Sequence, residues 1–216
     1  MQSTAATLSL SVAAGSQLEV RSSVQSSGTI NVSGPGQVIF DRLVEGAIDN
    51  SGNTRVRNAV DGSVVNRAGA EIALLGDVTG SLNNLGQATV AGDISGSVTN
   101  SGNLFVAVSQ DGDDTDMVEL SNAATGLVSV RAGAELSVDQ DIDNAGRLAV
   151  TGTLNGRVIA SGDSRTELVS EDGSAGRLNG DLISGGVVQF SGGTLDGDLT
   201  SNGSIEGSGT IIGNFL

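Results

Sequence analysis

The sequence predicts an all-β fold, a single-stranded, right-handed parallel β-helix of about 10–11 coils. Three observations lead to this prediction: a recurring glycine phrase, a second glycine at a fixed distance after it, and short runs of alternating apolar and polar residues. One bare unit spans 16–17 residues, which accommodates three short strands joined by glycine-rich corners. We therefore expect residues 1–216 to form one solenoid, as a segment of a longer repeat protein.

The recurring phrase has the form Gly, any residue, apolar, any residue, Gly, any residue, apolar. Its six copies begin at Gly76, Gly92, Gly152, Gly176, Gly193 and Gly209. A turn glycine follows each complete copy ten residues after its start, as Gly86 follows Gly76. Alternating residues come next, for example Ala88 and Val90, which gives a strand one apolar and one polar face. Strands this short bury a core only when coil stacks on coil.

The turn glycines recur along most of the chain and are accompanied by asparagines. Asn50, Asn84, Asn100 and Asn144 each lie two residues before a turn glycine, and Asn66 and Asn122 occupy similar places. Asparagine tolerates the backbone conformations of tight corners. Stacked in register, these amides are expected to form a hydrogen-bonded column inside the corner. We therefore interpret these asparagines as structural residues of the corner rather than as a row of ligand-binding side chains.

The turns counted from Gly28 to Gly203 include three long spacings of 24 residues, which predict three loop insertions. They span about Ser33–Leu43, Ser109–Met117 and Glu167–Ala175. Each is expected to follow the same strand of its coil, so all three should leave one edge of the rod. Insertions carry specificity on solenoids, because the coils themselves serve as scaffold.

The composition excludes several classes of function. The chain has 10 basic and 25 acidic residues, a net charge of −15, and neither Cys nor His. All basic residues are arginine, so P-loop and Schiff-base chemistry lack their lysine. The negative charge opposes nucleic acid and anionic membranes, and no apolar stretch is long enough to span a bilayer. We expect neither nucleic-acid binding nor direct membrane insertion.

The second insertion is rich in carboxylates. Asp111, Asp113, Asp114 and Asp116 lie within six residues, and oxygen ligands in a flexible loop are what calcium prefers. The spacing is not that of an EF-hand loop. The alternative interpretation is a solvated acidic loop tip, whose composition suits a turn. Calcium is the single cofactor that the sequence suggests.

Other residues give no signal for catalysis. A glycosidase needs two opposed carboxylates across a sugar-sized cleft, and no motif here pairs two of them. We therefore expect the chain to have no enzymatic activity. Phe105 should face outward between the inward Leu104 and Val106, covered by the acidic insertion. Arg55 and Arg165 are expected in the same outward position of other coils, where they pair weakly with acids.

The asparagine-rich turns carry a family resemblance. The phrases Asn50-Ser-Gly52, Gly96-Ser-Val-Thr-Asn-Ser-Gly102 and Ser201-Asn-Gly-Ser-Ile-Glu-Gly-Ser-Gly-Thr-Ile-Ile-Gly213 resemble the β-helical passenger domains of Gram-negative autotransporters and related haemagglutinin-like surface proteins. The resemblance covers nearly the whole chain. It implies an extracellular location on the bacterial outer surface and a role in adhesion, self-association or biofilm formation. The partners would be host or cell-surface molecules, or other copies of the chain.

A second resemblance remains open. The repeated Gly-Asp-apolar phrase, at Gly76 and Gly92, is similar to that of bactofilins, cytoplasmic polymers of short β-helical coils. The sixth repeat ends at Leu216 before its turn, with Ile211 and Phe215 in apolar positions. An open terminal coil has unpaired strand edges that can template another strand. This alternative predicts an end-to-end homo-oligomer, a filament inside or outside the cell.

Overall fold

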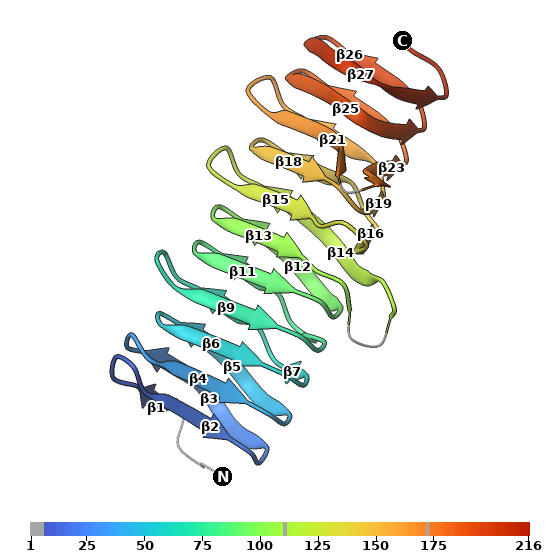
Figure 1. Ribbon diagram of the computed structural model, residues 1–216. Helices are drawn as coiled ribbons and strands as arrows, with labels where there is room; N and C mark the ends of the chain where they lie inside the picture. Colours follow the sequence, from blue (N-terminus) through green and yellow to red (C-terminus); the bar gives the residue numbers. More distant parts are fainter. Residues whose placement is uncertain (1–6, 110–111, 172) are drawn as a thin grey trace.

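The structure, a computed structural model, describes residues 7–109, 112–171 and 173–216. The chain winds into a rod of about 11 coils, stacked from the N-terminal to the C-terminal end (Figure 1). Each strand of the stack pairs in parallel with the equivalent strand of the next coil. This arrangement confirms the predicted parallel β-helix. Within the described ranges, no helix has the length and apolar character needed to cross a membrane.

The rod has three faces, which we number in the order that the chain meets them. The first face comprises β1 (Thr7–Ser11), β3 (Val24–Ser33), β5 (Val44–Asn50), β8 (Val64–Asn66), β10 (Leu82–Asn84), β12 (Ile94–Asn100), β14 (Thr115–Asn122), β17 (Ile142–Asn144), β20 (Val158–Ala160), β24 (Leu182–Ser184) and β26 (Leu199–Ser201). Its middle strands end at the predicted asparagines, so the corner that follows is the asparagine corner.

The second and third faces complete each coil. The second face comprises β2 (Gln17–Val20), β4 (Gln37–Phe40), β6 (Asn53–Val56), β9 (Glu71–Leu74), β11 (Gln87–Val90), β13 (Asn103–Val106), β15 (Leu127–Val130), β18 (Arg147–Val150), β21 (Arg165–Glu171), β25 (Val187–Asp196) and β27 (Ser204–Ile212). The third face comprises β7 (Val60–Asp61), β16 (Glu135–Val138), β19 (Thr153–Asn155), β23 (Arg177–Asn179) and parts of longer strands that turn a corner.

The core is a narrow stack of aliphatic side chains inside the rod. Alternation places every second residue inward, as with Ala88 and Val90 on β11, both fully buried. Burying one valine, leucine or isoleucine contributes about 1.5–3 kcal/mol, so the stability accumulates coil by coil. At several corners the preceding coil leaves no room for a Cβ. A Cβ on Gly102 would lie 2.1 Å from the carbonyl oxygen of Gly86 in the coil before it.

The asparagine corner forms the predicted hydrogen-bonded column. Side-chain Nδ2 of each asparagine donates to Oδ1 of the next at 2.8 Å, in the order Asn50, Asn66, Asn84, Asn100, Asn122 and Asn144. All six side chains are buried. Asn100 also donates to the carbonyl oxygen of Leu127 at 3.0 Å, which ties the column to the second face. The interpretation as a structural column is therefore confirmed.

The structure contains two of the three predicted insertions. The prediction of the first insertion is wrong. The segment around Ser33–Leu43 contains β4, which stacks in register between β2 and β6 and is an ordinary part of its coil. The long spacing before Gly52 results from counting Gly28 as a turn, which the structure contradicts. Gly28 lies inside β3, where its carbonyl approaches Gly46 of the next coil. The true corner glycine of that coil is Gly34, whose φ of +92° requires glycine.

Candidate functional site at the loop edge

The two genuine insertions leave the rod at the same corner. One connects Val106 at the end of β13 with Thr115 at the start of β14, and the other connects Leu168 of β21 with β23. Both therefore lie between the second and third faces, at a corner that we call the loop edge, and Figure 1 shows both on one side of the rod. β13 and β21 are three coils apart through β15 and β18. This separation corresponds to about 14 Å.

The second excursion has secondary structure of its own. β21 continues past the second face and pairs antiparallel with β22 (Ser174–Ala175), matching Ser170 with Ala175 and Glu171 with Ser174. This small hairpin is the one antiparallel pairing among the described residues. It projects from an otherwise parallel stack, which makes it a local feature that another molecule can recognise.

A row of aspartates runs along the loop edge at the first excursion. The backbone N–H of Asp93 donates to Oδ1 of Asp77 at 3.1 Å, and the N–H of Asp116 donates to Oδ1 of Asp93 at 2.9 Å. Each carboxylate thus caps the backbone of the next coil, where the connection has left the strand ladder. The Gly-Asp-apolar phrase has this structural reason, which holds for the related caps of Asp181 and Asp198 as well.

The predicted calcium ligands meet the aspartate row. Asp116 lines a surface hollow of about 180 Å³ together with Asp93 and Asp139. Burial raises the pKa of Asp116 above its ordinary value, and the negative charges of Asp114, Asp93 and Asp139 raise it further. Asp114 has Ser137 as a further partner, whose hydroxyl donates to its Oδ2 at 2.7 Å. The loop edge is therefore a place of concentrated negative charge.

The described residues do not assemble a metal centre. Among them, no group of three or more carboxylates is placed to hold a metal ion. Asp113 and Asp114 lie in the described part of the loop, whereas Asp111 lies outside the described residues. Calcium binding by Asp111, Asp113, Asp114 and Asp116 stays a prediction.

An ionic cluster marks the second face beside the hairpin. The carboxylate of Glu167 accepts hydrogen bonds from Arg147 at 2.6 Å and from Arg165 at 2.5 Å, and Arg165 also binds Gln189. Burial by itself raises the pKa of Glu167. The hydrogen bonds and charges of the two arginines outweigh burial, so its pKa lies below the ordinary value. This cluster joins three successive coils, β18, β21 and β25, at the base of the hairpin.

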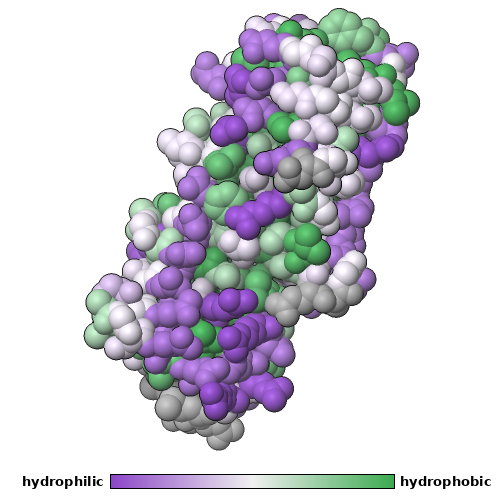
Figure 2. Space-filling model, viewed as in Figure 1, coloured by the Kyte–Doolittle hydropathy of each residue, from purple (hydrophilic) through white to green (hydrophobic). Residues whose placement is uncertain are grey.

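The outward aromatic residue is covered by an arginine. Phe105 is half-buried, and the guanidinium carbon of Arg131 lies 4.6 Å from its ring centroid, a cation–π geometry. Arg55 shares its outward row, as predicted, but Arg165 does not, because the register places Glu167 there instead. Figure 2 shows hydrophobic side chains in the middle of the visible face, interspersed with hydrophilic ones.

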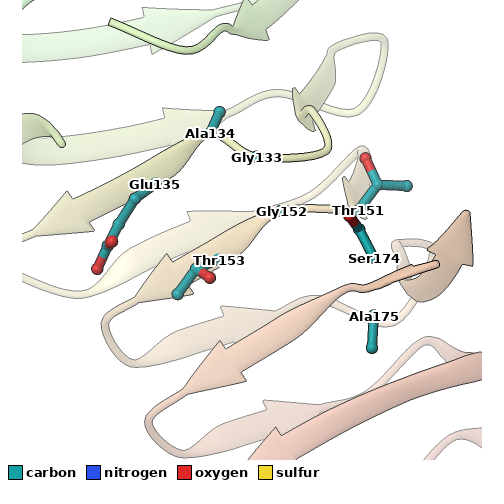
Figure 3. A pocket seen from close by; sticks show the side chains of 8 residues that line it. All are labelled: Gly133, Ala134, Glu135, Thr151, Gly152, Thr153, Ser174 and Ala175. Carbon is teal, nitrogen blue, oxygen red and sulfur yellow. The ribbon is translucent and has the colours of Figure 1, made fainter. Parts of the chain in front are cut away.

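A shallow hollow lies on the loop edge between the two excursions. It has a volume of about 290 Å³ and is lined by Gly133, Ala134, Glu135, Thr151, Gly152, Thr153, Ser174 and Ala175 (Figure 3). Glu135 is the single ionisable side chain of this lining, and its Oε1 accepts a hydrogen bond from Asn155 at 2.7 Å. Glycoside hydrolysis needs two opposed carboxylates, which the lining of this hollow does not supply.

Comparison with protein families, with curated proteins and with solved structures gives no match to this chain.

Proposed function

We propose that the chain is a non-catalytic rod of a surface-exposed, autotransporter-like protein, which mediates cell–cell or cell–surface contact. The observation that carries the proposal is the projection of both excursions from one edge of a regular stack. A solenoid is held together by neighbouring coils, so loops at one corner can vary without disturbing the fold. The asparagine-rich turns, similar in style to passenger domains, favour an extracellular location on the bacterial surface.

The rod would act as a rigid spacer that presents the two excursions to a partner. The excursions stand about 14 Å apart along the rod, which suits a partner that contacts both. The partner would be a molecule of the host or neighbouring cell surface, or another rod. Rods with a net charge of −15 repel one another. Contact between rods is therefore expected to require salt, or calcium at the aspartate row.

The experiment is adhesion by beads that carry the purified chain. In one variant, residues 107–116 are replaced by Ala-Gly-Asp, the connection that β11 and β12 use at residues 91–93. In a second, residues 169–176 are shortened in the same way. A matched control replaces the exposed Ala124 and Thr125 of the opposite corner by serine. Adhesion to bacterial cells should fall in both shortened rods and not in the control. Unchanged adhesion by folded, shortened rods contradicts the proposal.

A second candidate function is end-to-end assembly, like that of bactofilin filaments. The observation in its favour is the terminal strand β27, exposed along all nine of its residues. The last coil holds five of the exposed large apolar side chains, namely Ile205, Ile211, Ile212, Phe215 and Leu216. Electron microscopy of the 216-residue chain distinguishes the two functions. Long filaments of one rod diameter support assembly, and isolated rods of about 50 Å oppose it.

A further inference from the structure

The asparagine column ends at Asn144, and the coil that follows has an alanine in its place. The parallel register runs without interruption from Asn144 to Ala160 and on to Ser184. Stacking therefore continues, but the chain of side-chain amides does not. Asn144 accepts a hydrogen bond from Asn122, while its own Nδ2 has no partner within the described part of the chain. A buried amide donor without an acceptor is a costly exception in a folded protein.

Two further buried polar atoms without partners belong to residues whose register positions adjoin Ala160. They are the hydroxyl of Thr166, on the second face of the Ala160 coil, and the hydroxyl of Ser184, one coil further. Thr166 is fully buried, and Ser184 is 1% exposed. In all, the structure has four such side-chain atoms among its described residues, and three of them lie around Ala160. The fourth, the hydroxyl of Thr115, belongs to the third face.

The register explains why these three atoms belong together. Thr166 occupies the position of Thr54 in its coil, as Ala160 occupies that of Asn50. In that earlier coil, the hydroxyl of Thr54 donates to Oδ1 of Asn50 at 2.8 Å. An asparagine at position 160 would therefore bind Asn144 on one side and Thr166 on the other. Ala160 lacks the amide, so both neighbours lose the same partner.

The missing amide corresponds to the size of a water molecule. Alanine lacks three heavy atoms of asparagine, and a water molecule occupies about 30 Å³. The corner also differs at this level, because four residues separate Ala160 from β21 whereas two residues separate Asn144 from β18. Solvent reaches the outer side of this corner through a hollow of about 300 Å³ that Asn144 and Ser161 help to line.

We propose that a buried water site lies beside Ala160 and completes the polar column. The water oxygen accepts a hydrogen bond from Nδ2 of Asn144, and the water shares further hydrogen bonds with the hydroxyls of Thr166 and Ser184. Three partners is the usual number for a buried water. The site is independent of the proposed adhesion. It makes solvent a structural element of the coil that connects the asparagine column to the C-terminal coils.

The direct test is a high-resolution crystal structure of the chain. The expected result is an ordered water within hydrogen-bond distance of Asn144 Nδ2 and at least one of the two hydroxyls. A dry site, or rotation of these side chains to protein partners, overturns the proposal. The variant Ala160→Asn should replace the water by an amide in register with the column and raise Tm by about 2–4 °C. The half-buried, outward Ala149→Asn is its matched control and should leave Tm unchanged.

A second pair of variants gives an answer in solution, whether or not Ala160→Asn folds. Thr166→Val removes one partner of the water and should lower Tm. Thr115→Val removes an orphaned hydroxyl outside the site and should raise Tm, because an unpaired buried hydroxyl is costly. If Thr166→Val raises Tm as Thr115→Val does, the hydroxyl of Thr166 binds no water and the proposal is wrong.

Discussion

The coils from Asn50 to Asn144 and the coils after Ala160 share one register and differ in how their corners are stabilised. In the first region, each coil adds a buried amide to one hydrogen-bonded column, and the amides between its two ends bind the amides of both neighbours. In the second, Ala160, Ser184 and Ser201 take those places, and the surface cluster of Glu167 with two arginines links the coils instead. A solenoid therefore needs a repeated shape at each corner, but not a repeated chemistry.

The largest expected effect concerns the close backbone approach of neighbouring coils, which both regions share, as at Gly102 in the first and Gly203 in the second. Gly102→Ala places a Cβ 2.1 Å from the carbonyl oxygen of Gly86, a contact with backbone that has no room to move. We expect a loss of more than about 4 kcal/mol, since the two coils must separate. Gly162→Ala, at the exposed tip of the longer corner that follows Ala160, is the control. A Cβ there meets nothing closer than 4.0 Å and the φ is ordinary, so this variant should stabilise by about 0.4–1 kcal/mol.

Urea unfolding of both variants measures this contrast. Equal losses from Gly102→Ala and Gly162→Ala would show that the backbone contact at Gly102 is not the cause of its effect.

The next largest effect should come from the column itself. Asn100→Ala removes a side chain that donates to Asn122 and Leu127 and accepts from Asn84. Two buried amides then lose a partner, so we expect a loss of about 3 kcal/mol in the free energy of unfolding. The control is Asn103→Ala, an exposed asparagine three residues later, with an expected change within about 0.5 kcal/mol. A small effect at Asn100 would mean that the column follows the fold rather than stabilises it.

In the second region, Glu167→Gln tests the ionic cluster. The side chain loses its charge between Arg147 and Arg165, which are about half-exposed, so the expected loss at neutral pH is about 1–2 kcal/mol. The pKa of Glu167 is lowered in the folded chain. Its contribution is thus present above the unfolded value of about 4.3 and disappears as the pH falls through the lower, folded value.

Thermal unfolding of wild type and Glu167→Gln over an acidic pH series checks this sign. The exposed Glu171→Gln on the same strand serves as control and should have little effect. A difference that persists unchanged in strong acid would assign the loss to packing and not to charge.

The asparagine corner was predictable from the sequence, because these asparagines lie at a fixed distance before a turn glycine. The same signal failed at Gly28. A glycine is required both at a corner, as at Gly34, and where two strands approach closely, as at Gly46. Spacing alone does not separate these two needs, so it predicts an insertion where β4 lies.

The sites at the loop edge and beside Ala160 depend on register, which the sequence leaves open. Asn144 and Ala160 are 16 residues apart, whereas Ala160 and Ser184 are 24 apart, because a hairpin intervenes. Only the paired strands bring these residues to one corner. The same is true of Asp93, Asp116 and Asp139, which come together from successive coils. The acidic loop was recognisable by composition, and its neighbours were not.

The smallest expected effect concerns the aspartate row, whose carboxylates repel one another. The pKa of Asp116 is raised in the folded chain by burial and by neighbouring acids. Ionised Asp116 therefore destabilises the fold at neutral pH, and Asp116→Asn should stabilise it by about 0.5 kcal/mol. The gain should shrink as the pH falls and vanish below the unfolded value of about 3.9, where the carboxyl group is protonated in both states.

Addition of calcium tests whether the clustered carboxylates bind an ion. If the acidic loop binds calcium, about 1 mM calcium should raise the Tm of the wild type. It should shift the Tm of Asp116→Asn less, since a ligand has been lost. Glu119→Gln, exposed further along β14, should respond like the wild type. An absence of any shift would reject the calcium prediction and leave the row as a backbone cap. The asparagine region would then hold its coils by amides within the corner, against repulsion between the carboxylates that cap its loop edge.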